Sequence, residues 1–303
     1  MNRIGIIGGG TAGMTAAIYA VRGGCQATVF EQAMFGGQIV NTASIENYPG
    51  LYQVSGADYA MKLYEQCVAL GVEFLFSGVT AARLEDREKI LESGGKEHAF
   101  DAVIIANGAQ YRKLGCPGEE RLTGHGVSYC ATCDGAFYRG KTACVVGGGN
   151  TALEDALFLS ATCKEVYLIH RRQEFRAHQA TVEALRKREN VHFILDSVVE
   201  EILGEDHMES LVVKNTVTGE AVNLEAQGVF VAIGVSPDNG LFSGQLELDG
   251  SGYLKAGEDC CTNLPGVYAA GDTRSKPLRQ LVTAAADGAA AAVSAAAYLQ
   301  LRE

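Results

Sequence analysis

The clearest pattern of apolar and polar positions along the chain occurs twice. Residues 3–31 and residues 142–172 each begin with a continuous apolar run, pass through a glycine-rich turn and an amphipathic stretch, and end in a second apolar run. A continuous apolar run is typical of a parallel strand buried on both faces. The turn and the helical stretch after it complete a βαβ unit. The chain is therefore predicted to contain two copies of one α/β unit.

Both glycine-rich turns fit the pattern G-x-G-x-x-G/A. Such glycines allow a tight turn and a close approach of the backbone to a pyrophosphate, and the third small residue lets the helix pack on the strand. A turn without a ligand is the alternative, but the position of each turn between a strand and a helix favours a dinucleotide site. The residues expected to bind dinucleotide are Gly8, Gly10, Thr11, Ala12 and Gly13 in the first copy and Gly147, Gly149, Asn150, Thr151 and Ala152 in the second.

The two copies differ at the end of their second strand. Glu31 and His170 occupy equivalent positions there, counted from the third small residue of each turn. A carboxylate accepts hydrogen bonds from ribose hydroxyls, so the first copy suits FAD or NAD. His170 is followed by Arg171, Arg172 and, one turn on, Arg176, whose guanidinium groups suit the 2′-phosphate of NADP(H). A solvated charged face is the alternative interpretation of these arginines.

Two cysteines lie between the copies, in the run Cys130-Ala131-Thr132-Cys133-Asp134. Thiols at this spacing can close a disulfide, and Asp134 offers a carboxyl group that can move the proton needed in thiol–disulfide exchange. A structural zinc site is the alternative, but it needs four ligands and the chain has no second C-x-x-C pair. Cys130, Cys133 and Asp134 are therefore expected to form a redox centre, with no metal site.

Composition limits the class of protein. The 303 residues are enough for two domains of about 150 residues each. The chain is 47% hydrophobic and 20% charged, which is typical of a globular protein. A formal net charge of -11 argues against nucleic acid as a partner, because phosphate binding needs a surplus of lysine and arginine.

The longest apolar segment is the alanine-rich stretch 283–299. It is interrupted by Asp287 and Gly288, so a packed helix is expected there and no membrane span.

Strand-like sequence from Ile4 leaves no room for a leader peptide. The nine cysteines do not suggest a disulfide scaffold, so a reducing cytoplasm is expected. Four cysteines in apolar stretches are expected to be small core residues: Cys25, Cys67, Cys144 and Cys163.

Several specific motifs follow one another along the chain: GGGTAG at 8–13, FGGQ at 35–38, ENYPG at 46–50, CATCDGAFY at 130–138, GGGNTALE at 147–154, HRRQEFR at 170–176, and PGVYAAGD at 265–272 followed by Arg279-Gln280. In this combination the chain resembles the low-molecular-weight, bacterial-type thioredoxin reductases over nearly its whole length. The resemblance implies FAD on the first unit and NADPH on the second. It also implies a homodimer and an acceptor that is thioredoxin or a thioredoxin-like protein.

The resemblance also implies roles for single residues. Cys133 would lie nearest the flavin and Cys130 would attack the partner disulfide; the spacing alone does not distinguish the two sulfurs. Asn107 stands where the family more often has threonine, and residues 273–278 have no assigned role. The FAD contacts implied are Glu31 at the adenosine ribose, Val79 at the adenine, Gly36, Gly37, Gln38 and Asn47 on the flavin side, Asp272 at the ribityl or pyrophosphate region, Arg279 and Gln280 at the isoalloxazine, and also Ala106, Gly108 and Gly271.

The expected fold class is α/β, with two Rossmann-like domains of the three-layer β/β/α type. The resemblance places the FAD domain in residues 1–112 and 243–303 and inserts the NADPH domain, residues 113–242, with its C-x-x-C pair. If the pair and the NADPH fingerprint compete for one flavin, the inserted domain must rotate between half-reactions.

Other functions are also compatible with these motifs. A flavin disulfide reductase could serve another acceptor or take electrons from ferredoxin, although the arginine cluster argues for NADPH. A disulfide-forming enzyme that uses oxygen would not need that cluster. A nucleotide-sensing or zinc-bearing binding protein is a rival from a different class.

Overall fold

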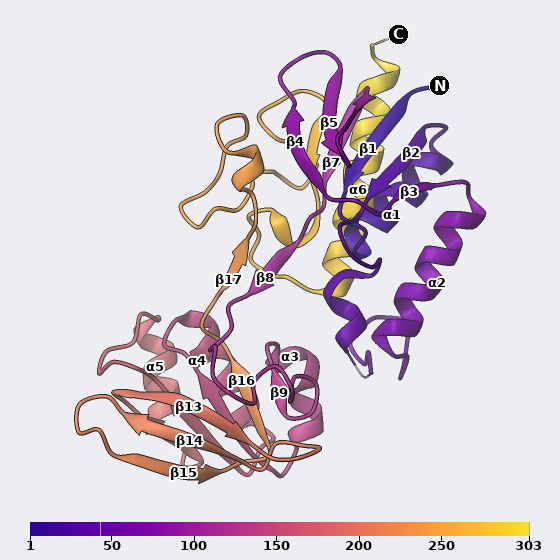
Figure 1. Ribbon diagram of the computed structural model, residues 1–303. Coiled ribbons are helices and arrows are strands. Elements are labelled where there is room, and N and C mark those ends of the chain that lie inside the picture. The colour runs from indigo at the N-terminus through magenta and orange to yellow at the C-terminus, as the bar shows by residue number, and fades with distance from the viewer. Residues whose placement is uncertain (43, 303) are drawn as a thin grey trace. The chain divides into compact units, whose positions relative to one another are not determined.

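The computed structural model describes residues 1–42 and 44–302, and within them the chain divides into two compact units (Figure 1). Unit 1 comprises Met1–Gln110 and Ser236–Glu303, and unit 2 is the continuous segment Tyr111–Val235. The chain crosses between them at β8 (Ala109–Tyr111) and β17 (Val235–Pro237), which pair with each other. The second crossing precedes residue 243 because Asn239 and Phe242 are buried within unit 1.

The centre of unit 1 is a parallel sheet with the strand order β18-β7-β1-β2-β3. Ile4 and Ile6 of the first strand are fully buried, as the continuous apolar run predicts. The strands are β1 (Arg3–Ile7), β2 (Gln26–Phe30), β3 (Glu73–Leu75), β7 (Ala102–Ile105) and β18 (Val267–Ala269).

Each face of this sheet is covered by a different layer. Ile104 joins the core formed with the helices, whereas Val103 and Ile105 join the core formed with the antiparallel strands, as the alternation of strand side chains requires. The helices are α1 (Thr11–Arg22), α2 (Gly56–Ala69) and α6 (Leu281–Gln300), and the antiparallel strands are β4 (Val79–Arg83), β5 (Lys89–Ser93) and β6 (Lys96–Phe100).

Unit 2 repeats this arrangement around a parallel sheet with the strand order β12-β11-β10-β16-β9. Val145 and Leu168 face the helices, and Cys144 and Ile169 face an antiparallel layer. The elements are β9 (Val127–Ser128), β10 (Thr142–Val146), β11 (Glu165–Ile169), β12 (Val191–Ile194), β16 (Gly228–Val231), α4 (Asn150–Ser160) and α5 (Gln179–Arg186), with β13 (Ser197–Leu203), β14 (Ser210–Asn215) and β15 (Ala221–Glu225) in the antiparallel layer. The expected fold class, two Rossmann-like three-layer domains with the second inserted into the first, is confirmed.

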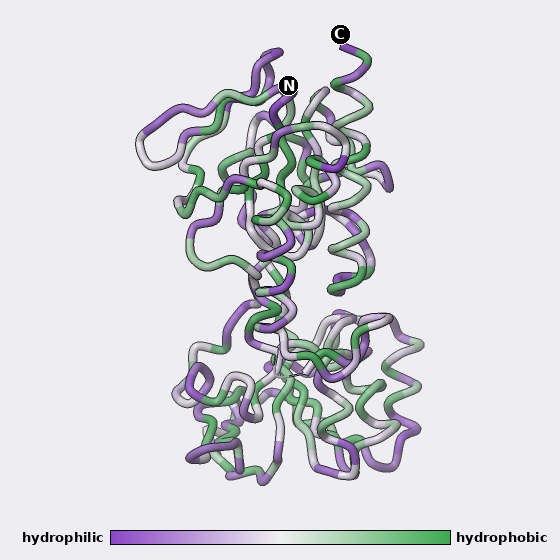
Figure 2. Tube along the Cα trace, turned by 90° about the vertical axis from the view of Figure 1, so that its right-hand side faces the viewer, coloured by the Kyte–Doolittle hydropathy of each residue, from purple (hydrophilic) through white to green (hydrophobic). Residues whose placement is uncertain are grey.

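The alanine-rich segment forms α6, as predicted. In the described part of the chain, α6 is the one helix long and apolar enough to cross a membrane. In Figure 2 the helix that leads to the C label is mostly green, the colour of hydrophobic residues. It packs against α1 so closely that a Cβ added at Gly288 would overlap the carbonyl oxygen of Ala12. The helix is therefore an integral part of the unit 1 core.

Asp287, which interrupts the apolar run of α6, is buried in an ion cluster. It accepts hydrogen bonds from Arg274 at 2.8 Å, from Lys276 at 2.7 Å and from the N–H of Gly271 at 3.0 Å. Burial alone would raise the pKa of the Asp287 carboxyl. The hydrogen bonds from Arg274 and Lys276 outweigh this effect and hold the pKa below its usual value. The cluster ties the segment 273–278, which has no role assigned from the sequence, to the last helix.

Candidate functional site

The unit 1 residues expected to bind a dinucleotide lie at one edge of its parallel sheet. Parallel strands end at the same edge, where ligands of such sheets bind. The turn 8–13 follows β1, Glu31 follows β2, Ala106 and Gly108 follow β7, and Gly271 and Asp272 follow β18. The structure thus brings together segments that are far apart in the sequence.

The glycines of the first turn are required by close backbone contacts. Gly8 has a φ of 106°, and an added Cβ would overlap the carbonyl oxygen of Ala106. A Cβ on Gly13 would overlap the carbonyl oxygen of Gly8. Gly10 caps α1 without any side-chain hydrogen bond, so the free N–H groups of the first helical turn are available for phosphate oxygens.

Gly13→Ala should destabilise unit 1 strongly, whereas the natural residue at the equivalent position of unit 2 is Ala152. The added methyl group would force α1 away from β1, with an expected cost of about 3 kcal/mol. We expect a clear loss of thermal stability and a lower flavin-to-protein absorbance ratio in the purified variant.

The matched control is Ala152→Gly in unit 2, which should cost only about 1 kcal/mol through helix propensity. An unchanged melting temperature together with full flavin content in Gly13→Ala would show that the close contact does not limit the turn.

Glu31 is fixed against the glycine turn. One carboxylate oxygen accepts the N–H of Gly9 at 2.7 Å and the other accepts the N–H of Ala33 at 3.0 Å. The N–H of Gly36 donates to the carbonyl oxygen of Gly9 at 2.8 Å. Glu31 and the FGGQ segment therefore flank the turn, and each carboxylate oxygen still has a lone pair for a further donor.

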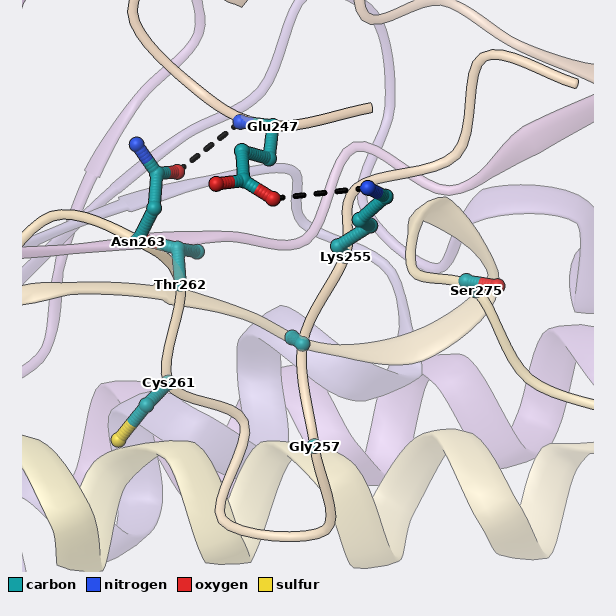
Figure 3. Close-up of a pocket in the computed structure, with 8 residues that line it drawn as sticks. Glu247, Lys255, Gly257, Cys261, Thr262, Asn263 and Ser275 are labelled. Carbon is teal, nitrogen blue, oxygen red and sulfur yellow. Dashed lines mark hydrogen bonds and ion pairs between the residues drawn. The ribbon is translucent and has the colours of Figure 1, made fainter. Parts of the chain in front are cut away.

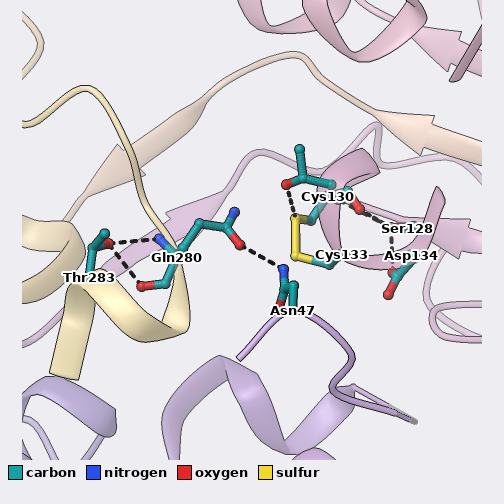
Figure 4. Close-up of a disulfide and its surroundings, with 8 residues drawn as sticks. Asn47, Ser128, Cys130, Cys133, Asp134, Gln280 and Thr283 are labelled. Atoms are coloured by element: carbon teal, nitrogen blue, oxygen red, sulfur yellow. Dashed lines mark hydrogen bonds between the residues drawn. A yellow bond between two sulfur atoms is a disulfide. The ribbon is translucent and has the colours of Figure 1, made fainter. Parts of the chain in front are cut away.

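The side chains expected on the flavin side are held by contacts within unit 1. The Gln38 amide donates to the carbonyl oxygen of Ala109, and the Asn47 amide donates to Gln280 Oε1 at 3.0 Å (Figure 4). Gln280 caps α6 in a capping box with Thr283. The remaining expected contacts are Gly37 at the start of a 3₁₀ turn (Gly37–Asn41), Thr11 and Ala12 in the first turn of α1, and half-buried Val79 at the start of β4.

Two buried oxygen atoms in this region have no hydrogen-bond partner among the described residues. They are Oδ1 of Asp272 and Oδ1 of Asn107. Burial raises the pKa of the Asp272 carboxyl. A buried acceptor without a donor is costly, so this region suits a ligand that brings hydroxyl or N–H donors, such as FAD.

The neighbours of these two oxygens are well fixed. The Asn107 amide donates to the carbonyl oxygen of Asp238 at 2.7 Å, so asparagine supports the turn at this position. The Arg279 guanidinium donates to the carbonyl oxygen of Asp272 at 3.3 Å and lies 3.9 Å from the centre of the Tyr253 ring. Asp272 and Arg279 are thereby held at the same end of the sheet.

The second glycine turn follows β10 in unit 2. A Cβ on Gly147 would overlap the carbonyl oxygen of Ala232, which explains the glycine there. Gly149 caps α4 without a side-chain hydrogen bond, and a Cβ added to it would meet open space. The first turn of α4, which includes Asn150, Thr151 and Ala152, is thus open to an anionic ligand.

His170 has a different environment from that of the arginines beside it. It is only 9% exposed, its ring lies against Gly148 and stacks with Phe175 at 5.3 Å, and burial lowers its pKa. The ring therefore packs the loop onto the glycine turn. Arg171 and Arg172 are exposed.

Two hydrogen bonds donated by main-chain N–H groups hold the arginine loop beside the glycine turn. The N–H of Arg176 donates to the carbonyl oxygen of Gly148 at 2.7 Å, and the N–H of His178 donates to Asn150 Oδ1 at 2.8 Å. Arg176 is exposed, like the other two arginines, and none of the three makes an ion pair with any residue in 1–42 or 44–302. Three guanidinium groups without a partner anion suit a phosphate group.

Cys130 and Cys133 form a disulfide, with their Cα atoms 5.3 Å apart (Figure 4). Cys130 follows β9 and caps the short helix α3 (Ala131–Asp134). Since β9, β16 and β10 are parallel neighbours, the disulfide and the turn at Gly147 lie at the same edge of the unit 2 sheet. The strands β9 and β10 that lead to them are two strand spacings apart, about 10 Å.

Asp134 is held by a serine that the sequence motifs do not single out. The Ser128 hydroxyl donates to Asp134 Oδ2 at 2.6 Å and accepts the N–H of Cys130 at 3.1 Å. Burial raises the pKa of the Asp134 carboxyl, and the hydrogen bond from Ser128 partly opposes this. A carboxyl group with a raised pKa suits proton transfer near neutral pH.

The other seven cysteines are free thiols. The four expected core cysteines are buried, which confirms that prediction. Cys261 is exposed and lines a groove of about 520 Å³ on unit 1 with the Lys255–Glu247 ion pair (Figure 3). This groove contains none of the expected site residues.

Among the residues with described positions, no three histidine, cysteine or acidic side chains gather as a metal site would require.

The sequence model of the pyridine nucleotide-disulphide oxidoreductases matches residues 2–289, so the chain belongs to this family, whose members use a flavin and a nicotinamide nucleotide. Within the family it is 44% identical over 296 residues to a thioredoxin reductase of Mycolicibacterium smegmatis, a match covering 97% of this chain and 95% of the relative. It is 42% identical over 304 residues to a thioredoxin reductase of Peptoclostridium litorale, covering 98% and 96%.

A solved structure agrees with these relatives. The crystal structure of thioredoxin reductase from Streptococcus pyogenes matches with a TM-score of 0.94 at 40% identity, covering 98% of each chain. The resemblance inferred from the sequence motifs is therefore confirmed.

Proposed function

We propose that this chain is a thioredoxin-disulfide reductase. Electrons pass from NADPH through FAD to the Cys130–Cys133 disulfide, and from there to thioredoxin or a thioredoxin-like protein. The observation that carries the proposal is the disulfide at the sheet edge that also bears the arginine-flanked fingerprint, in a chain whose other unit has an acid-flanked fingerprint. The relatives named thioredoxin reductase support the same acceptor.

The proposed FAD domain corresponds to unit 1, so residues 236–242 are part of it. The turn 8–13 would hold the pyrophosphate, Glu31 the adenosine ribose, and Asp272 would receive a donor for its buried oxygen. When bound, FAD supplies the two-electron reduction of the disulfide. Arg279 and Gln280, directly before the first residue of α6, would place positive charge and helix N–H groups on the flavin side.

The proposed NADPH domain corresponds to unit 2, residues 111–235. The turn at Gly147 would hold the pyrophosphate, and Arg171, Arg172 and Arg176 would bind the 2′-phosphate. His170 fits a supporting role, because its buried ring orients the arginine loop.

The exchange with the acceptor takes place at the sulfurs. The Cys130 thiol gives its proton to the Asp134 carboxylate, and its sulfur bonds to one sulfur of the acceptor disulfide, which breaks. The acceptor sulfur that leaves takes this proton from Asp134. Cys133 then bonds to Cys130 sulfur, the mixed disulfide breaks, and the second acceptor sulfur takes up the proton of Cys133. Two electrons and two protons have then moved to the acceptor.

The proposed assembly is a homodimer and the proposed location is the cytoplasm, where thiols stay reduced. Light scattering on the purified protein measures the assembly directly, and a monomer at working concentration would overturn this part.

Anaerobic titration with NADPH tests the proposed function. The purified protein should be yellow, and NADPH should bleach the flavin at far lower concentration than NADH does. Oxidised thioredoxin added afterwards should restore the absorbance and gain two thiols per molecule. A glutaredoxin-like protein and ferredoxin serve as comparison partners. A colourless protein, or a flavin that NADPH does not reduce, would overturn the proposal.

A further inference from the structure

Ser128 connects the two groups that thiol–disulfide exchange requires. It is the last residue of β9 and is 5% exposed. Its hydroxyl lies 2.6 Å from Asp134 Oδ2 and 3.1 Å from the backbone nitrogen of Cys130. A hydroxyl has one proton to donate and two lone pairs. It can therefore donate to the carboxylate while it accepts the Cys130 N–H.

Asp134 depends on this hydrogen bond because its surroundings supply little else. Within the described part of the chain, Ser128 is the side chain that donates to it. The Tyr138 phenol, in the 3₁₀ turn (Gly135–Tyr138) after α3, interacts with it electrostatically. The thiols of Cys130 and Cys133 also lie at this site when the disulfide is reduced.

The helix α4 also packs against α3 and carries Glu154 and Asp155. Burial raises the pKa of Asp155 to about 7, but neither carboxyl contributes to the pKa shift of Asp134. Asp155 nonetheless titrates in the range in which the enzyme would be assayed, so its effect has to be separated experimentally.

We propose that Ser128 is a positioning residue for the exchange step, holding the Asp134 carboxyl and the Cys130 backbone in one hydrogen-bonded arrangement. The inference rests on the proposed function and adds the residue that orients its proton carrier. Ser128 keeps its own proton throughout, while Asp134 receives the Cys130 proton and passes it to the acceptor sulfur that leaves. The hydroxyl stabilises the ionised carboxylate, which is the form that accepts the thiol proton.

The test is the pH profile of kcat/KM for thioredoxin in Ser128→Ala. Without the donor, burial raises the pKa of Asp134 unopposed. The acid limb of the profile should therefore move to higher pH by about one unit, the size expected for one lost hydrogen bond to a charged group. Ser128→Thr retains the hydroxyl and should restore the limb toward its original position.

Two control variants isolate the effect. Ser160 is also buried in unit 2, and its hydroxyl donates to the carbonyl oxygen of Leu157 at 2.7 Å, so Ser160→Ala should leave the profile in place. Asp155→Asn should likewise leave the acid limb unmoved. In an Asp134→Asn background, Ser128→Ala should produce no further shift, because the group that it positions is already neutral.

A uniform loss of kcat/KM at every pH in Ser128→Ala would overturn the inference, since that is the effect of a purely structural residue. A carbon NMR titration of the Asp134 carboxyl follows the same pKa without turnover, and an unchanged midpoint would also overturn it. If the alanine variant does not fold, Ser128→Gly removes the same hydroxyl and gives the same comparison. Normal thioredoxin reduction by the parent protein leaves the proposed function standing in each case.

Discussion

Cys130→Ser is expected to abolish thioredoxin reduction while the flavin is still reduced by NADPH. The serine hydroxyl is not ionised at neutral pH and cannot form a disulfide, so neither the protein disulfide nor the mixed disulfide can form. Turnover with thioredoxin should fall by about three orders of magnitude or more. Stopped-flow measurement of flavin bleaching should give a rate close to that of the parent protein.

The matched control is Cys261→Ser, which removes an exposed thiol of unit 1 and should leave turnover unchanged. Cys133→Ser and Cys130→Ser each leave one free thiol, and comparing their alkylation rates distinguishes the two sulfurs, because the sulfur that attacks the acceptor has to be the more accessible one. Unchanged thioredoxin turnover in Cys130→Ser would remove the basis of the proposed function.

Replacement of Arg171 and Arg172 by alanine should remove most of the preference for NADPH over NADH. Each guanidinium that binds a phosphate contributes about 1.5–3 kcal/mol, so KM for NADPH should rise at least about 100-fold for the pair. KM for NADH should stay nearly constant, because its ribose has no 2′-phosphate. Steady-state flavin reduction with both nucleotides measures the ratio, and added salt should reduce the difference between parent and variant.

Arg188→Ala is the control for overall charge, since Arg188 is exposed in the same unit but lies outside the HRRQEFR loop. An equal rise of KM for NADPH and for NADH in the double variant would mean that the arginines stabilise the loop and do not bind the 2′-phosphate.

The two βαβ units could be predicted because their signals are local. Ile4, Ile6 and Val145 lie in continuous apolar runs, and a helical period follows each within a few residues. The antiparallel layers were expected only through the family resemblance. Strands such as β4 and β15 are largely exposed, so their sequences lack the alternation that identifies a strand.

The site was predictable where a residue type is dictated by its own turn. Gly8, Gly13 and Gly147 are required by nearby backbone atoms, and the C-x-x-C pair needs only its own spacing. The partners that orient the site come from contacts that no spacing encodes. Ser128 lies in an ordinary strand end, and Arg274 meets Asp287 only after α6 has packed.

The order of the two units along the chain determines which unit is complete first during synthesis. Strand β18 pairs with β7, and α6 covers α1, so residues 267–300 finish a domain that begins at residue 3. All of unit 2 is synthesised between these two parts of unit 1. Because domains generally fold as units during synthesis, unit 2 is available for folding first. Met14 and Ala16 of α1 can pack against their C-terminal partners only after those residues have been synthesised. A chain that stops after residue 235 would therefore contain all of unit 2 and a first domain that has a sheet edge and a helix face left uncovered.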